Sequence, residues 1–193
     1  MDLQNLSIDE KLDLIFGLYE KHGSDDYIGE PVSQLEHMCQ SAQLAENEGF
    51  EDEVILAAFF HDIGHLFAHL GSSESMGGFG TKRHEQLGAE YLRQLGFPET
   101  IAKLVENHVQ AKRYLTFKNP EYLQKLSEAS LATLGYQGGP MTASEAIAFE
   151  KDPLFEASLK MRTWDEEAKL ENKPLADLDT YRQMAKNILL SQR

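Results

Sequence analysis

The stretch Val54-Ile-Leu-Ala-Ala-Phe-Phe-His-Asp-Ile-Gly-His65 decides the fold. Seven apolar residues in succession place this segment in the core, within a helix that we expect near residues 51–66. His61 and Asp62 follow them at the buried end of that helix. An imidazole beside a carboxylate in such a position can bind one hard or borderline cation. Histidine-aspartate dipeptides also arise by chance, so the pair by itself leaves an ordinary structural role open.

Helix signals recur along the rest of the chain, and strand signals do not. Ser7 and Ser33 each precede a glutamate by three residues, which is the spacing of a capping box. Glycines follow several apolar-periodic stretches, where a residue with positive φ often ends a helix; these are Gly23, Gly49 and Gly96. The predicted helices lie near residues 7–22, 33–48, 51–66, 82–95, 98–112, 119–134, 143–150, 154–170 and 178–191, and a loop is predicted over Gly71–Gly80. We therefore expect an all-α, compact bundle of roughly nine helices.

The composition is that of a folded, acidic protein. At 193 residues, with 41% hydrophobic and 26% charged residues, the chain fits one domain, 1–193, and has no apolar run long enough for a transmembrane helix. The formal net charge of −14 argues against nucleic acid and membrane surfaces as partners, so an anionic ligand needs a local positive site. The start of the chain does not resemble a secretory signal, and the single Cys39 fits a reducing compartment. We expect a cytoplasmic protein in which Cys39 is buried on a helix.

Further candidate metal ligands lie on other predicted helices, namely His37, His84, His108 and Asp165. Histidines from different helices of a bundle can converge on a metal or cofactor in the core. His22 and His69 have no such context, and we expect both at the surface.

The set His37…His61-Asp62…Asp165 resembles the H…HD…D metal-binding signature of the HD-domain superfamily, a helical fold rich in metal-dependent phosphohydrolases. His84 and His108 fall in the interval where dinuclear members carry two additional histidines. The resemblance implies an HD-domain bundle with two metal ions, which Asp62 would bridge.

A more specific resemblance covers most of the chain from Tyr27 to Glu166. It rests on the blocks Asp26-Tyr-Ile-Gly-Glu30, Gln34-Leu-Glu-His37, Met76-Gly-Gly-Phe-Gly80, His108-Val-Gln-Ala-Lys-Arg-Tyr-Leu115, Leu126-Ser-Glu-Ala-Ser130, Tyr136-Gln-Gly-Gly-Pro-Met141 and Trp164-Asp165-Glu. These resemble the PhnZ-type phosphonate-cleaving diiron oxygenases. The resemblance implies a mixed-valent Fe(II)/Fe(III) pair that uses O2 to cleave the carbon–phosphorus bond of a 1-hydroxyalkylphosphonate, giving phosphate and a carboxylic acid. It also implies a place downstream of a phosphonate hydroxylase.

The resemblance assigns a role to each matching residue. One iron would be held by His37, His61, Asp62 and Asp165, and the other by Asp62, His84 and His108. Tyr27 would cap an iron in the resting state, and Glu30 would face an ammonium group on the substrate. The phosphonate would contact His65, Lys112, Ser130 and Gln137. Independently of the resemblance, His65 and Lys112 each lie one helical turn after a candidate ligand, which places them on the same helix face.

Other functions share parts of this pattern. An HD phosphohydrolase acting on a phosphate ester or nucleotide would use the same first four ligands and could also use Lys112. That function gives no role to Tyr27 with Glu30. Myo-inositol oxygenase shares the dinuclear arrangement but cleaves a neutral polyol, whereas Lys112 and His65 favour an anion. A non-catalytic helical module would be expected to have lost ligands, and all six positions are filled. For single residues, a solvated Lys112, a half-buried core Tyr27 and a helix-entry Glu30 are the ordinary alternatives.

Overall fold

The computed structural model describes residues 3–27, 29–70 and 74–192, and of residues 69 and 70 only the backbone. Within those ranges the chain is helical and forms no strand, which confirms the predicted all-α class. Gly71–Ser73 of the predicted loop and the side chain of His69 lie outside the described residues. The elements are the short 3₁₀ helices η1 (Leu3–Asn5) and η2 (Ile63–Leu70) and the α-helices α1 (Ile8–His22), α2 (Gln34–Asn47), α3 (Asp52–Phe60), α4 (His84–Leu95), α5 (Glu99–Lys118), α6 (Pro120–Lys125), α7 (Glu128–Tyr136), α8 (Ala143–Phe149), α9 (Phe155–Glu167) and α10 (Leu178–Ser191).

Three predicted helices have different bounds in the structure. The helix predicted at 51–66 is α3 followed by η2, and the break falls at His61-Asp62. The helix predicted at 119–134 is divided into α6 and α7, because Leu126 is extended and the Ser127 hydroxyl caps α7 by accepting from the Ser130 amide at 3.2 Å. The helix predicted at 98–112 continues to Lys118. It ends there because the following Asn119 precedes Pro120, which disfavours helical backbone at the residue before it.

The larger of two apolar clusters lies between α1, α2, α3, α4, α5, α9 and α10. Its centre is a group of aromatic rings in which Phe59 stacks on Tyr181 at 4.5 Å and lies 4.7 Å from Tyr19, centroid to centroid. Six of the nine residues of α3, Ile55–Phe60, are buried, as the apolar run in its sequence predicts. Cys39 is also buried, and the burial raises the pKa of its thiol to about 12, so it is an inert core residue.

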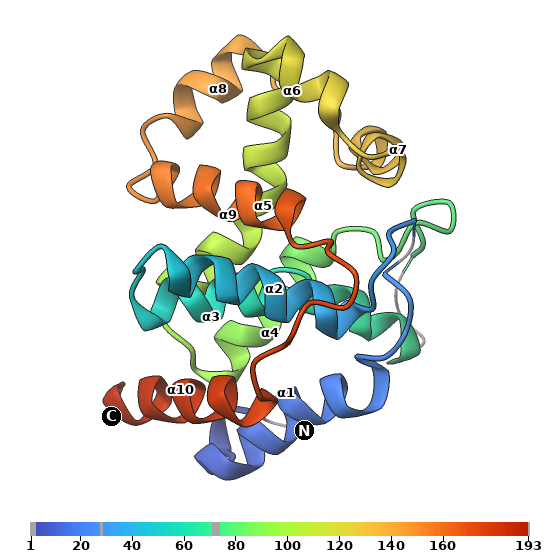
Figure 1. Cartoon of the computed structure of the whole chain (residues 1–193). Coiled ribbons are helices and arrows are strands. Elements are labelled where there is room, and N and C mark those ends of the chain that lie inside the picture. The colour runs from blue at the N-terminus through green and yellow to red at the C-terminus, as the bar shows by residue number, and fades with distance from the viewer. Residues whose placement is uncertain (1–2, 28, 71–73, 193) are drawn as a thin grey trace.

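The smaller apolar cluster lies at the other end of α5. It consists of Ala111, Met141, Ala146 and Phe149, with Tyr114 packed against it. Helix α5 runs from the larger cluster into the group formed by α6, α7 and α8, as Figure 1 shows. Residues near the middle of α5 therefore lie at the junction between the two clusters, and His108 and Lys112 are among them.

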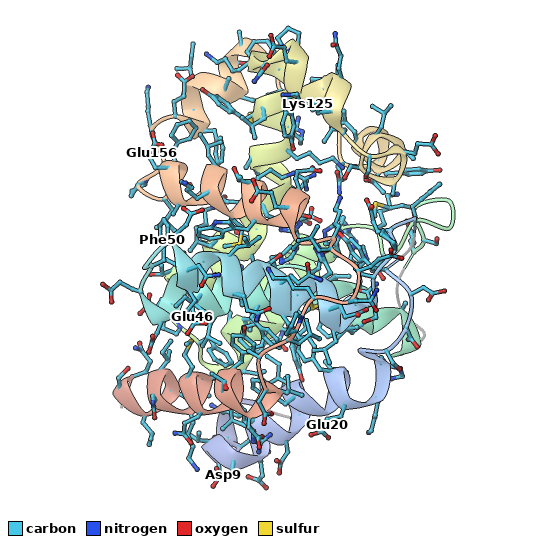
Figure 2. The ribbon with its side chains drawn as sticks, in the orientation of Figure 1. Asp9, Glu20, Glu46, Phe50, Lys125 and Glu156 are labelled. Atoms are coloured by element: carbon cyan, nitrogen blue, oxygen red, sulfur yellow. The ribbon has the colours of Figure 1, made fainter. Side chains whose placement is uncertain are left out.

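Charged side chains cover the outside of the bundle. Figure 2 shows Asp9, Glu20, Glu46 and Glu156 pointing outward from its periphery, and all four are exposed. Among the described residues, no helix combines the length and the apolar character that crossing a bilayer requires.

Candidate metal centre

Five core elements each place one potential metal ligand at the same point. The ligands are His37 in α2, His61 at the C-terminal end of α3, His84 at the start of α4, His108 in α5 and Asp165 in α9, and Asp62 follows His61 directly. All six residues are buried. Arg83, which has left-handed backbone with φ of 57°, turns the chain immediately before His84. The predicted ligands are thus brought together from distant parts of the sequence.

Each of the four histidines uses its Nδ1 atom in the same way. Nδ1 of His37 lies 3.0 Å from the Ala168 carbonyl, and Nδ1 of His61 lies 2.8 Å from the Ala58 carbonyl. The corresponding distances for His84 and His108 are 3.3 Å to the Thr81 carbonyl and 2.6 Å to the Val105 carbonyl. A carbonyl oxygen only accepts, so each Nδ1 carries a proton, and each imidazole in its neutral form presents the lone pair of Nε2 to the centre.

The four Nε2 atoms form two pairs on either side of Asp62. Nε2 of His37 and His61 are 3.1 Å apart and lie 3.6 and 3.4 Å from Oδ2 of Asp62. Nε2 of His84 and His108 are 3.0 Å apart and lie 3.2 and 3.4 Å from Oδ1 of the same carboxylate. Two lone pairs facing each other at such distances repel unless a proton or a metal ion lies between them. The donor set therefore fits two metal ions, with one oxygen of Asp62 directed to each triad.

Asp165 adds a second carboxylate to the first triad. Its Oδ1 lies 3.5 Å from Nε2 of His37, while its Oδ2 accepts from the Arg162 guanidinium. Burial by itself would raise the pKa of Asp165, but Arg162 and the histidines hold it well below its ordinary value. Burial by itself would also raise the pKa of Asp62, but the surrounding histidines hold that pKa well below its ordinary value. Both carboxylates are therefore ionised.

Tyr27 and His65 contact the centre from outside the ligand set. The Tyr27 hydroxyl donates to Oδ2 of Asp62 at 2.9 Å, and its ring stacks on His37 with the centroids 4.0 Å apart. His65 stacks on His84, also at 4.0 Å, and its Nδ1 accepts from the Thr81 amide at 2.9 Å. Burial, followed by the neighbouring His84, lowers the pKa of His65 to about 3. His65 is therefore neutral, and its proton lies on Nε2.

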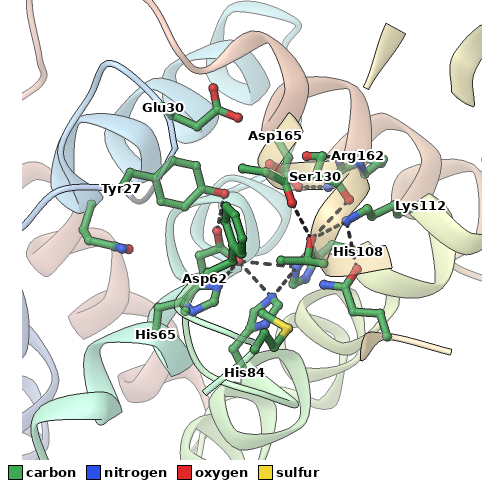
Figure 3. A pocket seen from close by; sticks show the side chains of 17 residues that line it. Tyr27, Glu30, Asp62, His65, His84, His108, Lys112, Ser130, Arg162 and Asp165 are labelled. Atoms are coloured by element: carbon green, nitrogen blue, oxygen red, sulfur yellow. Dashed lines mark hydrogen bonds and ion pairs between the residues drawn. The ribbon is translucent and has the colours of Figure 1, made fainter. Parts of the chain in front are cut away.

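A cavity of about 60 Å³ opens beside the two triads. At about 10–15 Å³ for each water-sized occupant, this is room for roughly four to six such occupants. The cavity wall includes four residues of the centre, Asp62, His84, His108 and Asp165. Figure 3 shows Lys112, Arg162 and Ser130 on one side of it, with Tyr27 and Glu30 on the other. The cavity thus has a cationic end and a tyrosine–glutamate end.

Lys112 is the centre of the cationic end. Its Nζ donates to Oγ1 of Thr133 at 2.8 Å and to Oε1 of Gln137 at 2.9 Å, and its side chain is almost completely buried. Burial, followed by the nearby Arg162 guanidinium, lowers its pKa to about 7. Ser130 also lies here, where its hydroxyl accepts from Arg162 at 3.3 Å.

Two residues of this end were missed by the reasoning from sequence, Arg162 and Thr133. Arg162 lies three residues before Asp165 and Thr133 three residues after Ser130, so each shares a helix face with a predicted site residue. That spacing is the signal that could have identified them. The alternative in which Lys112 is a solvated surface residue is wrong, because its side chain is almost completely buried and lines the cavity.

Glu30 has a partner that the sequence did not indicate. Its Oε1 lies 2.8 Å from Nζ of Lys169, which belongs to the segment after α9. The second carboxylate near this ammonium group is Glu166, with Oε2 at 3.6 Å.

An all-α bundle with two buried His/Asp triads has the architecture of a helical metalloprotein. The HD domain matches residues 34–181, and the chain belongs to the HD-domain family. It is 48% identical over 175 residues, covering 91% of this chain and 80% of the relative, to an uncharacterized protein of Acanthamoeba polyphaga mimivirus.

Two further relatives have named activities. The chain is 41% identical over 179 residues, covering 93% of it and 88% of the relative, to the 1-hydroxy-2-(trimethylamino)ethylphosphonate dioxygenase (glycine-betaine-forming) of Leisingera caerulea. It is 36% identical over 172 residues, covering 89% of it and 85% of the relative, to the hydroxymethylphosphonate dioxygenase of Gimesia maris. The resemblance to phosphonate-cleaving dioxygenases that the sequence blocks indicated is therefore confirmed.

Proposed function

We propose that this protein is a non-haem diiron dioxygenase that uses O2 to cleave the carbon–phosphorus bond of a small 1-hydroxyalkylphosphonate. The proposed substrate is 2-amino-1-hydroxyethylphosphonate or its N-trimethylated analogue, and the products are phosphate and glycine or glycine betaine. The observation that carries the proposal is the position of Asp62, with one oxygen facing each histidine pair. The named activities of the two bacterial relatives support the same reaction.

The donor set suits iron that changes oxidation state. His37, His61, Asp62 and Asp165 would hold one ion, and Asp62, His84 and His108 the other. Neutral imidazoles dominate, and only two carboxylates offset the charge of two cations, which favours the lower oxidation state of one iron. When bound, a mixed-valent Fe(II)/Fe(III) pair supplies electron transfer and the activation of O2.

The residues at the cationic end would bind and orient the phosphonate. Lys112 and Arg162 supply positive charge, Ser130 and Gln137 supply polar groups, and the neutral His65 donates from Nε2. This gives an anion the local positive site that a chain of net charge −14 otherwise lacks. The remainder of the substrate would then extend toward Tyr27 and Glu30.

Tyr27 would control access to the centre. Its hydroxyl proton is shared with Oδ2 of Asp62 at 2.9 Å, and its ring lies flat on His37, so the tyrosine covers the first triad from the cavity side. A substrate oxygen that approaches this triad has to displace the hydroxyl. Without substrate, Tyr27 would keep water and O2 away from the metals, which limits unproductive oxidation.

Oxygen dependence tests the proposed function. Iron-loaded protein is incubated with a panel of 1-hydroxyphosphonates in air and under anaerobic conditions, and phosphate and the organic acid are quantified. We expect phosphate in amounts matching the O2 consumed, with the acid that corresponds to the tail. Phosphate release that proceeds fully without oxygen would favour the hydrolase alternative, in which a metal-bound hydroxide attacks a phosphate ester. The family resemblance also implies that a phosphonate hydroxylase would supply the substrate.

A further inference from the structure

The Glu30–Lys169 ion pair lies where the tail of a bound phosphonate would be. The two side chains are 9% and 13% exposed, and their charged atoms are 2.8 Å apart. Glu30 lines the cavity on the side opposite Lys112 (Figure 3). A phosphonate held by Lys112 and Arg162 therefore points its other end at a carboxylate that already has a cationic partner.

We propose that Lys169 is a specificity-determining residue that lowers the preference of the site for cationic substrate tails. This inference rests on the proposed function. An ammonium or trimethylammonium tail has to compete with Lys169 for the Glu30 carboxylate, and two cations close together in a partly desolvated site repel each other. An uncharged tail leaves the ion pair intact.

Lys169 also favours the binding of an uncharged tail in a direct way. If Lys169 were absent, the Glu30 carboxylate would face the approaching phosphonate dianion without compensation, and like charges in a partly desolvated cavity repel each other. The lysine therefore acts on the two kinds of substrate in opposite directions. That opposition distinguishes a role in specificity from a general loss of structure, which would weaken both.

The surroundings of Lys169 allow it to yield to a cationic tail. Its Nζ has the Glu166 carboxylate 3.6 Å away, so a displaced ammonium group keeps a charged partner. Glu166 already accepts from Arg162 and from the Tyr122 hydroxyl, the latter at 3.3 Å. A displaced Lys169 would therefore share a carboxylate that already has other partners. Cationic substrates are disfavoured for this reason but not excluded.

Lys169→Met tests the proposal, because methionine keeps most of the side-chain volume and removes the charge. Two probes are compared, hydroxymethylphosphonate and 1-hydroxy-2-(trimethylammonio)ethylphosphonate. For the iron-loaded protein, kcat/KM is measured in air, and Kd is measured anaerobically by calorimetry, where no turnover occurs. We expect the ratio of the two affinities to shift toward the cationic probe by at least about tenfold. The shift should appear in Kd and KM, with kcat for each probe changed little.

Three variants make the result specific. Lys160→Met removes a lysine from α9 whose partner is the exposed Glu48 at 2.7 Å, and it should leave the ratio unchanged. Lys169→Arg keeps the charge and should stay near the wild-type ratio. In a Glu30→Gln background, Lys169→Met should no longer shift the ratio, because the lysine acts through that carboxylate.

The outcomes separate this inference from the proposed function. If the wild type turns over phosphonates and Lys169→Met leaves the ratio unchanged or moves it toward the uncharged probe, the role of Lys169 is refuted and the oxygenase stands. If the wild type neither binds nor consumes any 1-hydroxyphosphonate, both proposals fail together. Binding without oxygen-dependent phosphate release would overturn the reaction and leave the affinity ratio as the test of Lys169.

Discussion

Lys112 is the residue from which we expect the clearest pH dependence. Its pKa is lowered to about 7 by burial and by Arg162, and a phosphonate dianion binds its protonated form. As the pH rises above about 7, binding must take up a proton, so affinity falls by up to about tenfold per pH unit. The same shift acts on folding, because an unfolded lysine titrates near about 10.4. Between these two values the unfolded chain binds more protons, so stability contributed by Lys112 rises with pH.

The pH profile of kcat/KM checks this expectation. Lys112→Met should remove the alkaline decline assigned to the lysine and weaken phosphonate binding by about 2–4 kcal/mol, since anionic substrate and cavity groups lose a charged partner. Lys118→Met is the matched control, because Lys118 lies near the end of the same helix and pairs with Glu150 at 2.8 Å. An alkaline decline that persists in Lys112→Met at the same pH would show that another group titrates.

Asp62 differs from every other ligand because it faces both triads. Asp62→Ala should therefore lose both metals, whereas His84→Ala should lose the second metal and keep the first. Iron per chain, measured after anaerobic loading and desalting, distinguishes the two outcomes. His22→Ala alters a histidine outside the cluster and should retain the wild-type content. Equal iron loss in Asp62→Ala and His84→Ala would contradict the bridging position.

At the level of the elements, the close contact between η2 and α4 determines where His84 lies. A Cβ atom added at Gly64 would come within 2.0 Å of the His84 carbonyl oxygen and 2.8 Å of its Cα. Backbone atoms leave no flexible side chain to move aside. Only glycine lets the two elements approach in this way, so the Gly of the His-Asp-Ile-Gly-His stretch has a structural reason.

Gly64→Ala should push α4 away from η2 and displace His84 from its triad. We expect a loss of about 1–3 kcal/mol in the free energy of unfolding, with reduced occupancy of the second metal site. Gly17→Ala is the control, because Gly17 lies within α1 with no atom near the added Cβ. That change should be neutral or stabilising by about 0.5–1 kcal/mol. Urea unfolding midpoints that coincide for Gly64→Ala and wild type would refute the steric argument.

The elements also show what sequence reasoning could and could not reach. Capping boxes at Ser7 and Ser33 predicted the starts of α1 and α2, because a cap is a local interaction between residues three apart. The break after Phe60 was not predicted, because the apolar pattern continues into Ile63 and Leu66 and gives no local signal for it. Lys169 was missed for a similar reason. Its partner Glu30 lies at the other end of the chain, and nothing in the local sequence indicates the pairing.

For the whole molecule, the metal centre joins five elements that also pack together around the larger apolar cluster. Ligands come from α2, α4, α5 and α9 and from the end of α3, and the site lies where α5 leaves the larger apolar cluster for the smaller one. The polar side chains concentrated there would be costly to bury without partners. Metal binding therefore contributes to holding the five segments together as well as to chemistry.

Removal of the metals should lower the thermal stability of the whole chain. A ligand that binds only the folded state stabilises it by about 2.7 kcal/mol when its concentration is about 100 times Kd. For a chain of this size, about 1 kcal/mol corresponds to about 2–4 °C in Tm. Chelation should therefore lower Tm by about 5–10 °C for each site that was occupied at about 100 times its Kd. Calorimetry of iron-loaded and chelated protein under anaerobic conditions measures the difference. Asp62→Ala should melt at one temperature with or without iron, because both sites need its carboxylate. If the wild type also melts at one temperature in both states, no metal binds preferentially to its folded state, and the assignment of the two triads as metal sites is refuted.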